Sequence, residues 1–215
     1  MTTRNTPGTG PLIPIALAGL ACALAACNVV QPAQEDPTRY FVLSEPAVRP
    51  GQAPAPAAGV RIGLRAVRLE NYLHRREMVV RTGENEIQFR DYRRWAEPLD
   101  AGVARVLRTR LLASPEVAQV YAEPFPADQE RDFDVSIEVR RCEGSLAPSG
   151  KYAASLSAAI EVWTAGTNPH IVAHRVFVAP DAAWDGRDFD RLASLLTADV
   201  SALGQEVLAD LPPRN

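Results

Sequence analysis

Residues 133–140 read Phe-Asp-Val-Ser-Ile-Glu-Val-Arg, an alternation of apolar and polar side chains with a period of two. This period predicts a β-strand that buries one face and exposes the other. The alternation returns over 152–163, after a turn region of Gly, Ser and Pro at 144–150, and a further strand follows over 170–178. Because the turns between these strands are short, the sequence predicts an antiparallel meander.

Two segments with helical spacing flank this meander. A long amphipathic helix is predicted from Asp188 to Leu211, because one apolar stripe continues along it. That stripe consists of Phe189, Leu192, Leu196, Val200, Leu203 and Val207. A second helix is predicted to open at Glu97-Pro98, because the first turn of a helix tolerates proline. It ends at Ser114-Pro115.

Shorter strands are predicted before the first helix, over 39–43, 60–66, 78–81 and 87–89, the last two joined by a hairpin turn. The expected fold class is therefore mixed α/β of an α+β-like kind. About seven or eight strands form a mixed, mostly antiparallel sheet, with two main helices packed on it. The strand order is not set by these patterns.

The N-terminal segment has the features of an export signal. One arginine precedes an apolar run from Leu12 to Leu24, which is too short to cross a hydrocarbon core of about 30 Å. We expect residues 1–26 to be a signal peptide, 27–37 a tether rich in Pro, Gln and Glu, 38–211 a single domain, and 212–215 a short tail.

Cys27 is the expected lipidation site. Leu24-Ala25-Ala26-Cys27 resembles the lipobox of bacterial lipoproteins, in which the cysteine thiol is lipid-modified and the chain is cut before it, here between Ala26 and Cys27. Cys22 is a rival position, but a bulky Leu20 precedes it at −2. Cleavage at an Ala-x-Ala site into a soluble secreted protein is the alternative. Asn28, rather than Asp, favours sorting to the outer membrane.

The remaining composition argues against several function classes. A net charge of −3 and a single lysine, Lys151, do not favour nucleic acid or a polybasic membrane patch. Cys142 is the one cysteine outside the signal and the lipidation site, so no internal disulfide is expected. Its position in a strand predicts a small buried residue rather than a nucleophile.

No motif for catalysis, a cofactor or a metal is recognised. His170 and His174 lie in a predicted turn and strand, where four residues separate their rings too far for one ion, and His74 stands apart. The acidic cluster Asp181, Asp185, Asp188 and Asp190 lacks the spacing of a calcium loop, and Asp188 or Asp190 is placed to cap the last helix. We expect a protein that is not an enzyme.

Tyr72, Leu73 and Trp95 stand beside charged neighbours and could form a contact surface for a partner or a lipid. Core packing is the other interpretation of these three residues, since large aromatic side chains are usually buried.

The segments that contain these residues also carry a family resemblance. They are 60–64, 67–81, Asn85 and Arg94-Trp95-Ala96-Glu97-Pro98-Leu99, with 40–43 as a first strand. Together they resemble the ABC-type transport auxiliary lipoprotein family, of the PqiC-like group.

The resemblance implies a non-catalytic periplasmic component anchored in the outer membrane. It would work with an MCE-domain protein and an inner-membrane transporter to move lipids or other hydrophobic molecules, and it could form homo-oligomers. Two other classes remain open: a periplasmic envelope hydrolase whose site no local motif reveals, and a lipid carrier with an apolar cavity.

Overall fold

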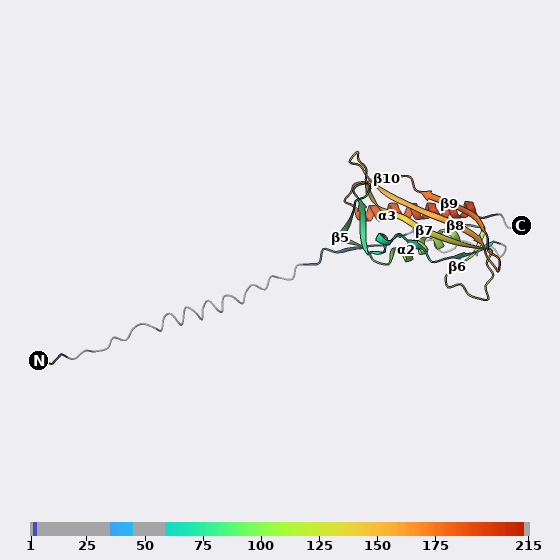
Figure 1. Ribbon diagram of the computed structural model, residues 1–215, viewed down its shortest axis with the longest axis horizontal. Coiled ribbons are helices and arrows are strands. Elements are labelled where there is room, and N and C mark those ends of the chain that lie inside the picture. The colour runs from blue at the N-terminus through green and yellow to red at the C-terminus, as the bar shows by residue number, and fades with distance from the viewer. Residues whose placement is uncertain (1, 4–34, 45–58, 213–215) are drawn as a thin grey trace. The chain divides into compact units, whose positions relative to one another are not determined.

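The computed structural model describes residues 2–3, 35–44 and 59–212. Ala26 and Cys27 lie outside these ranges. The chain divides into two compact units, Met1–Pro37 and Thr38–Asn215, and only the second contains described secondary structure (Figure 1). Its elements are, in order, β1 (Arg39–Phe41), β2 (Val60–Leu64), β3 (Arg68–Leu69), the 3-10 helix η2 (Asn71–His74), β4 (Glu77–Arg81), β5 (Ile87–Trp95), α2 (Leu99–Leu112), β6 (Val117–Ala122), β7 (Phe133–Leu146), β8 (Tyr152–Thr164), β9 (Ile171–Val178), β10 (Ala182–Trp184) and α3 (Phe189–Asp210).

The meander predicted from the alternating pattern forms the centre of the sheet. β7 and β8 pair antiparallel along their whole length, from Phe133 opposite Thr164 to Leu146 opposite Tyr152. β9 and β10 share the other edge of β8, and both are antiparallel to it. Residues of β7 and β8 that point to one side, such as Ile137 and Ile160, are fully buried, so this half of the sheet supplies much of the core.

Three short strands occupy the remaining edge of β7, and all run parallel to it. β2 pairs near its start, β3 near its middle and β4 near its end. The sheet continues from β2 to β6 at one end and from β4 through β5 to β1 at the other. The longest ladders are antiparallel, which confirms the mixed, mostly antiparallel sheet.

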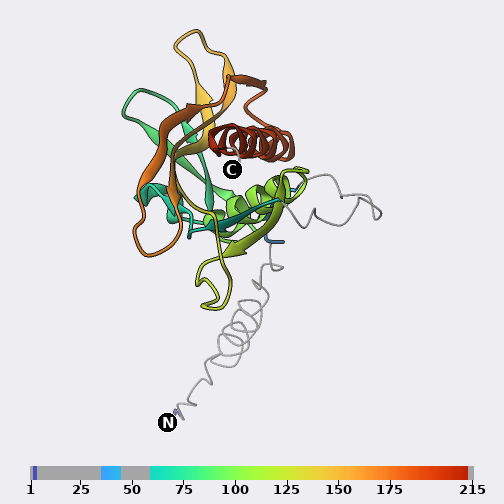
Figure 2. The same ribbon diagram turned by 90° about the vertical axis from the view of Figure 1, so that its right-hand side faces the viewer.

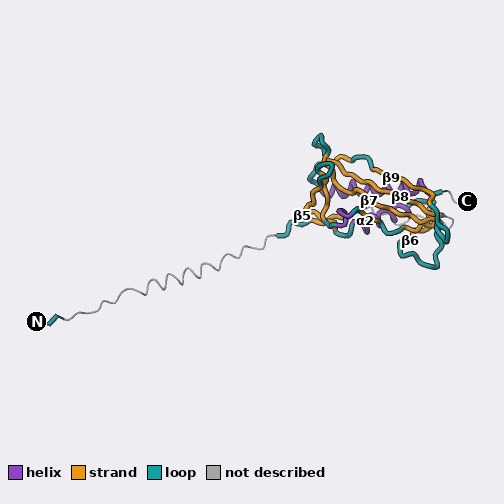
Figure 3. Tube along the Cα trace, in the orientation of Figure 1, coloured by secondary structure: helices purple, strands orange, loops and turns teal. Residues whose placement is uncertain are grey.

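Both helices pack on the sheet, as predicted. α3 contacts β7 and β8, and α2 contacts α3 and β6. Figure 2 shows the two helices side by side within the curve of the sheet, and Figure 3 shows them running along the strands. Their close approach needs Gly204 of α3, where an added Cβ would lie 2.9 Å from Cγ of Arg110 on α2. The predicted fold class and single folded domain are confirmed.

Several boundaries differ from the predictions. β7 continues to Leu146 through the start of the predicted turn, because its last residues still pair with β8, and Gly144 leaves room there for the Trp184 ring, which a Cβ would meet at 2.6 Å. Pro98 is the N-cap of α2 rather than part of its first turn. β6 and β10 are not predicted by the alternation, since each is short and buries only some of its residues.

Neither helix in the described ranges has the combination of length and apolar content that a membrane span requires.

Candidate functional site

Leu73 and Trp95 lie in the core, with only 2% and 4% of their surface exposed. Leu73 is in η2 and Trp95 ends β5, where its backbone N–H donates to the carbonyl of Arg76. Their interpretation as a contact surface is therefore wrong, because burial leaves neither side chain available to a partner. Core packing, the other interpretation, is what the structure shows.

Tyr72 belongs to a buried polar network around Glu143. The Glu143 side chain is completely buried in β7. It accepts a hydrogen bond from Arg81 Nε at 2.6 Å and one from the Tyr72 hydroxyl at 2.9 Å. The guanidinium of Arg81 also lies 5.9 Å from the centre of the Tyr72 ring. A carboxylate removed from water needs such partners, because its desolvation is costly.

The ionisation of this network fits a structural role. Burial, followed by the negative charge of Glu143, raises the pKa of Tyr72 well above its ordinary value, so the hydroxyl stays protonated and donates. Tyr72 and Arg81 both come from the segment that carries the family resemblance. Two of its distinctive residues therefore serve to satisfy one buried acid.

The other residues considered in the sequence are placed apart from one another. His74 ends η2, and His174 is in β9 opposite Glu161. His170 Nδ1 lies 3.0 Å from the Thr164 hydroxyl. Among the residues that the structure describes, no group of three or more His, Cys, Asp or Glu side chains is arranged to hold a metal.

One residue of the acidic cluster before α3 caps the helix, as predicted. Asp188 is the N-cap, and its Oδ1 accepts from the backbone N–H groups of Asp190 and Arg191 at 3.1 Å. Asp185 accepts from the N–H groups of Arg187 and Asp188, and these bonds hold the pKa of Asp185 below its ordinary value. Asp181 instead lies 3.4 Å from the Ser155 hydroxyl.

Cys142 is buried, as predicted, and burial raises the pKa of its thiol well above the ordinary value. A thiol held protonated in this way is a poor nucleophile.

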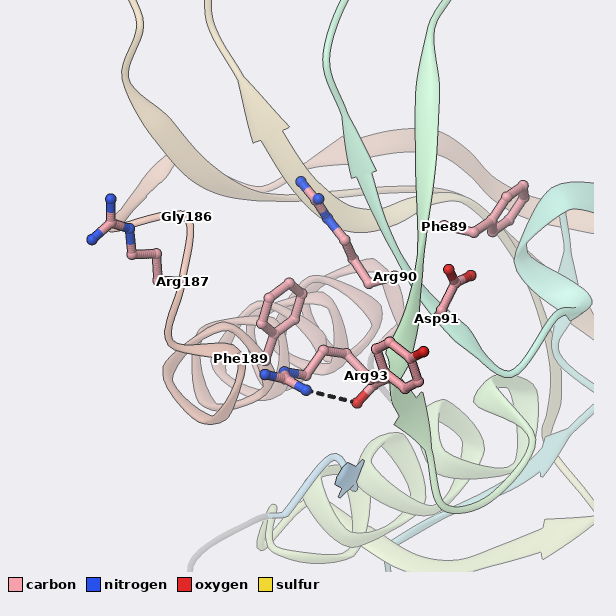
Figure 4. Close-up of a pocket in the computed structure, with 8 residues that line it drawn as sticks. Phe89, Arg90, Asp91, Arg93, Gly186, Arg187 and Phe189 are labelled. Atoms are coloured by element: carbon pink, nitrogen blue, oxygen red, sulfur yellow. Dashed lines mark hydrogen bonds between the residues drawn. The ribbon is translucent and has the colours of Figure 1, made fainter. Parts of the chain in front are cut away.

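A groove lined by arginine and aromatic side chains lies between β5 and the start of α3. It has a volume of about 420 Å³ and is shown in Figure 4. Its lining residues are Phe89, Arg90, Asp91, Tyr92, Arg93, Gly186, Arg187 and Phe189. Three of these are cationic and one is anionic, so the groove suits a negatively charged ligand.

A β-bulge brings the arginines of β5 together. Along β4, Glu77 pairs with Arg94 and the next residue, Met78, pairs with Arg90, so three residues of β5 have no counterpart. In a regular strand, Arg90 and Arg93 would point to opposite faces because they are three residues apart. With the bulge, both side chains lie on the same side of β5, where Arg93 reaches over the start of α3 and Arg90 extends above Phe189, as Figure 4 shows.

Aromatic rings form the floor of this groove. The Phe189 ring packs on Phe41 and Trp184, with centroids 6.3 and 5.2 Å apart. The Arg93 guanidinium lies 5.8 Å from the centre of the Phe189 ring and donates to the Tyr92 carbonyl at 2.9 Å. Asp91 also lines the groove, but its side chain lies on the other side of β5 from Arg90 (Figure 4).

Sequence reasoning missed this groove. The signal was local: three arginines in five residues, at 90, 93 and 94, beside Tyr92. The charge of the whole chain hides this run, because acids elsewhere outnumber the basic residues. Arg187 is almost a hundred residues away, and only the packing of α3 beside β5 adds it to the site.

The fold is similar to that of known structures. Protein XCC0632 from Xanthomonas campestris is 19% identical, with a TM-score of 0.63, and the match covers 79% of this chain and 92% of that one. An uncharacterised protein is 16% identical, with a TM-score of 0.59 over 81% of this chain and 99% of its own. At these identities the similarity concerns the fold. No curated protein matches the chain.

The family model for the ABC-type transport auxiliary lipoprotein component matches residues 41–208, from the end of β1 almost to the end of α3. This range includes every segment that carries the resemblance except Tyr40, and most of the chain. The protein therefore belongs to the family of ABC-type transport auxiliary lipoprotein components.

Proposed function

We propose that this protein is a lipoprotein of the outer membrane, facing the periplasm, that acts without catalysis as a docking component of an ABC/MCE-type transport system. The cargo would be lipids or other hydrophobic molecules. The observation that carries the proposal is the family match over 41–208, which spans nearly the whole folded unit. The partners would be an MCE-domain periplasmic protein and the inner-membrane transporter.

The anchor in this proposal is Cys27, which lies outside the described residues. Ten residues, 28–37, lie between it and Thr38, the first residue of the folded unit, which makes eleven steps along the chain. Fully extended, they reach at most about 40 Å at roughly 3.5 Å per residue. The lipid would therefore keep the start of β1 near the membrane surface while leaving the domain free to meet a partner.

Replacing Cys27 by serine is expected to move most of the protein from the membrane fraction to the soluble periplasmic fraction. A thioether-linked diacylglyceryl group cannot form on serine, and the lost burial of its methylenes is about 0.8 kcal/mol each. Fractionation followed by immunoblotting measures the change. Cys22→Ser is the matched control and should leave the protein membrane-bound. A Cys27→Ser chain that stays with outer-membrane fractions would contradict the anchor.

The free edge of β9 supports a docking role. Among the described strands, β9 pairs only with β8, so its outer backbone edge is available. Val178 is 67% exposed, and Ile171 and Val176 are each about half exposed. An exposed edge with apolar side chains can accept a strand from another protein, with backbone hydrogen bonds supplying affinity.

A photo-crosslinking amino acid at Val178 is expected to capture an MCE-domain protein in cells. Gln88, exposed on β5, is the control position and should give little or none of that product. Mass spectrometry of the crosslinked band identifies the partner. A product that contains only a second copy of this chain would assign the β9 edge to self-assembly and contradict its use for docking.

A further inference from the structure

We propose that the groove between β5 and the start of α3 binds the phosphate group of an anionic lipid headgroup. The site consists of Arg90, Arg93 and Arg187, with Phe189 as its apolar floor. The source of the ligand rests on the proposed function, since the lipid anchor is what would hold this end of the domain near a membrane. The chemistry of the groove follows from the side chains themselves.

Arg90 provides the first independent observation. Its Nε is buried and has no hydrogen-bond partner among the described residues. An unpaired donor on a buried charged group is unfavourable, and the guanidinium therefore depends on its two terminal nitrogens for compensation, which a ligand oxygen in the groove would supply. Figure 4 shows the Arg90 guanidinium extending into the space beside Phe189.

The charge of the groove is the second observation that supports the proposal. Arg90, Arg93 and Arg187 have no ion pair among the salt bridges found between described residues. The nearby carboxylates of Asp185 and Asp188 accept backbone N–H groups, and of the three arginines only Arg187 interacts electrostatically with Asp185. Guanidinium groups match phosphate oxygens in geometry and charge, and the paired bonds are stronger than neutral ones.

The surroundings of the groove favour a lipid over free phosphate. Tyr40 on β1 and Tyr92 on β5 are both more than half exposed, and β1 lies beside β5 with Arg39 paired to Arg93. Exposed tyrosines beside arginines are typical of surfaces that meet lipid headgroups, because the ring is apolar and the hydroxyl is polar. β1 is also where the tether joins the domain.

The test uses the purified lipidated full chain in a non-ionic detergent, titrated by calorimetry. The probes are dihexanoyl phosphatidylglycerol, dihexanoyl phosphatidylcholine and inorganic phosphate, each below its micelle-forming concentration where it has one. We expect phosphatidylglycerol to bind at least tenfold more tightly than the other two. Phosphatidylcholine has the same phosphate without a net negative charge, and inorganic phosphate lacks the chains.

Arg90→Gln combined with Arg93→Gln should weaken phosphatidylglycerol binding by about a hundredfold, roughly tenfold for each lost charged hydrogen-bond donor. Arg187→Gln should weaken phosphatidylglycerol binding about tenfold. Because Arg187 is in an exposed loop, this variant still tests the site if the double variant fails to fold. Arg68→Gln, on an exposed arginine elsewhere, is the control for charge and should leave binding unchanged.

Three results would overturn the proposal. The first is binding of inorganic phosphate as tight as that of phosphatidylglycerol, which would remove the lipid as the source of the ligand. The second is unchanged phosphatidylglycerol binding in both groove variants. The third is a loss of binding in Arg68→Gln equal to that in the groove variants, which would show a general attraction to positive charge. Crosslinking at Val178 does not involve these arginines. Failure of the headgroup site is therefore distinguishable from failure of the docking function.

Discussion

Replacing Glu143 by alanine is expected to lower the free energy of unfolding by about 3–5 kcal/mol, the usual cost of removing one partner from a buried ion pair. The Arg81 side chain is mostly buried beside it and would keep a charge without a counterion. The Tyr72 hydroxyl would lose its acceptor at 2.9 Å and keep the Arg140 carbonyl at 3.0 Å. Urea denaturation followed by circular dichroism measures the loss.

Glu138→Ala is the matched control, because Glu138 lies on the same strand and pairs with Arg68 at 4.0 Å on the exposed surface. The loss of this ion pair should lower the free energy of unfolding by about 1 kcal/mol or less, since solvent screens exposed pairs. A double replacement, Glu143→Leu with Arg81→Met, should recover most of the lost stability, because two apolar side chains leave no unpaired charge. A Glu143→Ala variant within 1 kcal/mol of the Glu138→Ala variant would contradict this account.

The second large effect concerns Asp199 on α3, which is only 8% exposed and whose Oδ2 has no hydrogen-bond partner among the described residues. Burial, followed by the charge of Asp181, raises the pKa of Asp199 to about 6. We expect Asp199→Asn to stabilise the protein above pH 7 by up to about 3 kcal/mol, the free energy of a shift of roughly two pKa units.

The sign follows from proton binding. Between about pH 4 and pH 6, the folded state holds a proton on Asp199 that the unfolded state has released, so stability falls as the pH rises through this range. Above this range, the folded state contains a buried carboxylate whose Oδ2 has no partner in the described part of the chain. The stability gained by Asp199→Asn should therefore be small at pH 4, rise to pH 6 and then stay level.

Urea denaturation of the unmodified protein and of Asp199→Asn between pH 4 and pH 8 gives the difference in their free energies of unfolding. The other carboxylates contribute equally to both proteins, so their contributions cancel in this difference. Asp190→Asn, at an exposed position on the same helix, serves as the control and should change stability by about 1 kcal/mol or less. A difference for Asp199→Asn that does not change with pH would show that the carboxyl is not desolvated as the structure places it.

Local periodicity was enough to predict the main elements. The alternation over 133–140 and 152–163 identifies β7 and β8, and the apolar stripe that begins at Phe189 identifies α3 almost to the residue. These patterns succeed because each long element buries one face, and burial imposes its own period on the sequence. The family resemblance, carried by residues before α2, is likewise present in the sequence and is confirmed by the match over 41–208.

The candidate site depended on contacts between distant segments. The arginine run in β5 is visible in the sequence, but its shared direction comes from the bulge opposite Met78, and a register of this kind depends on the partner strand. Arg187 joins only through the packing of α3.

Burial shows the same division between sequence and tertiary structure. Trp95 and Glu143 stand beside charged neighbours in the sequence, yet both are buried. Sequence spacing thus determined which segments become strands and helices, because that depends on neighbours within a few residues. The tertiary structure alone decided which charges are buried together and which face a groove, because pairing across the sheet joins residues some sixty positions apart, such as Arg81 and Glu143.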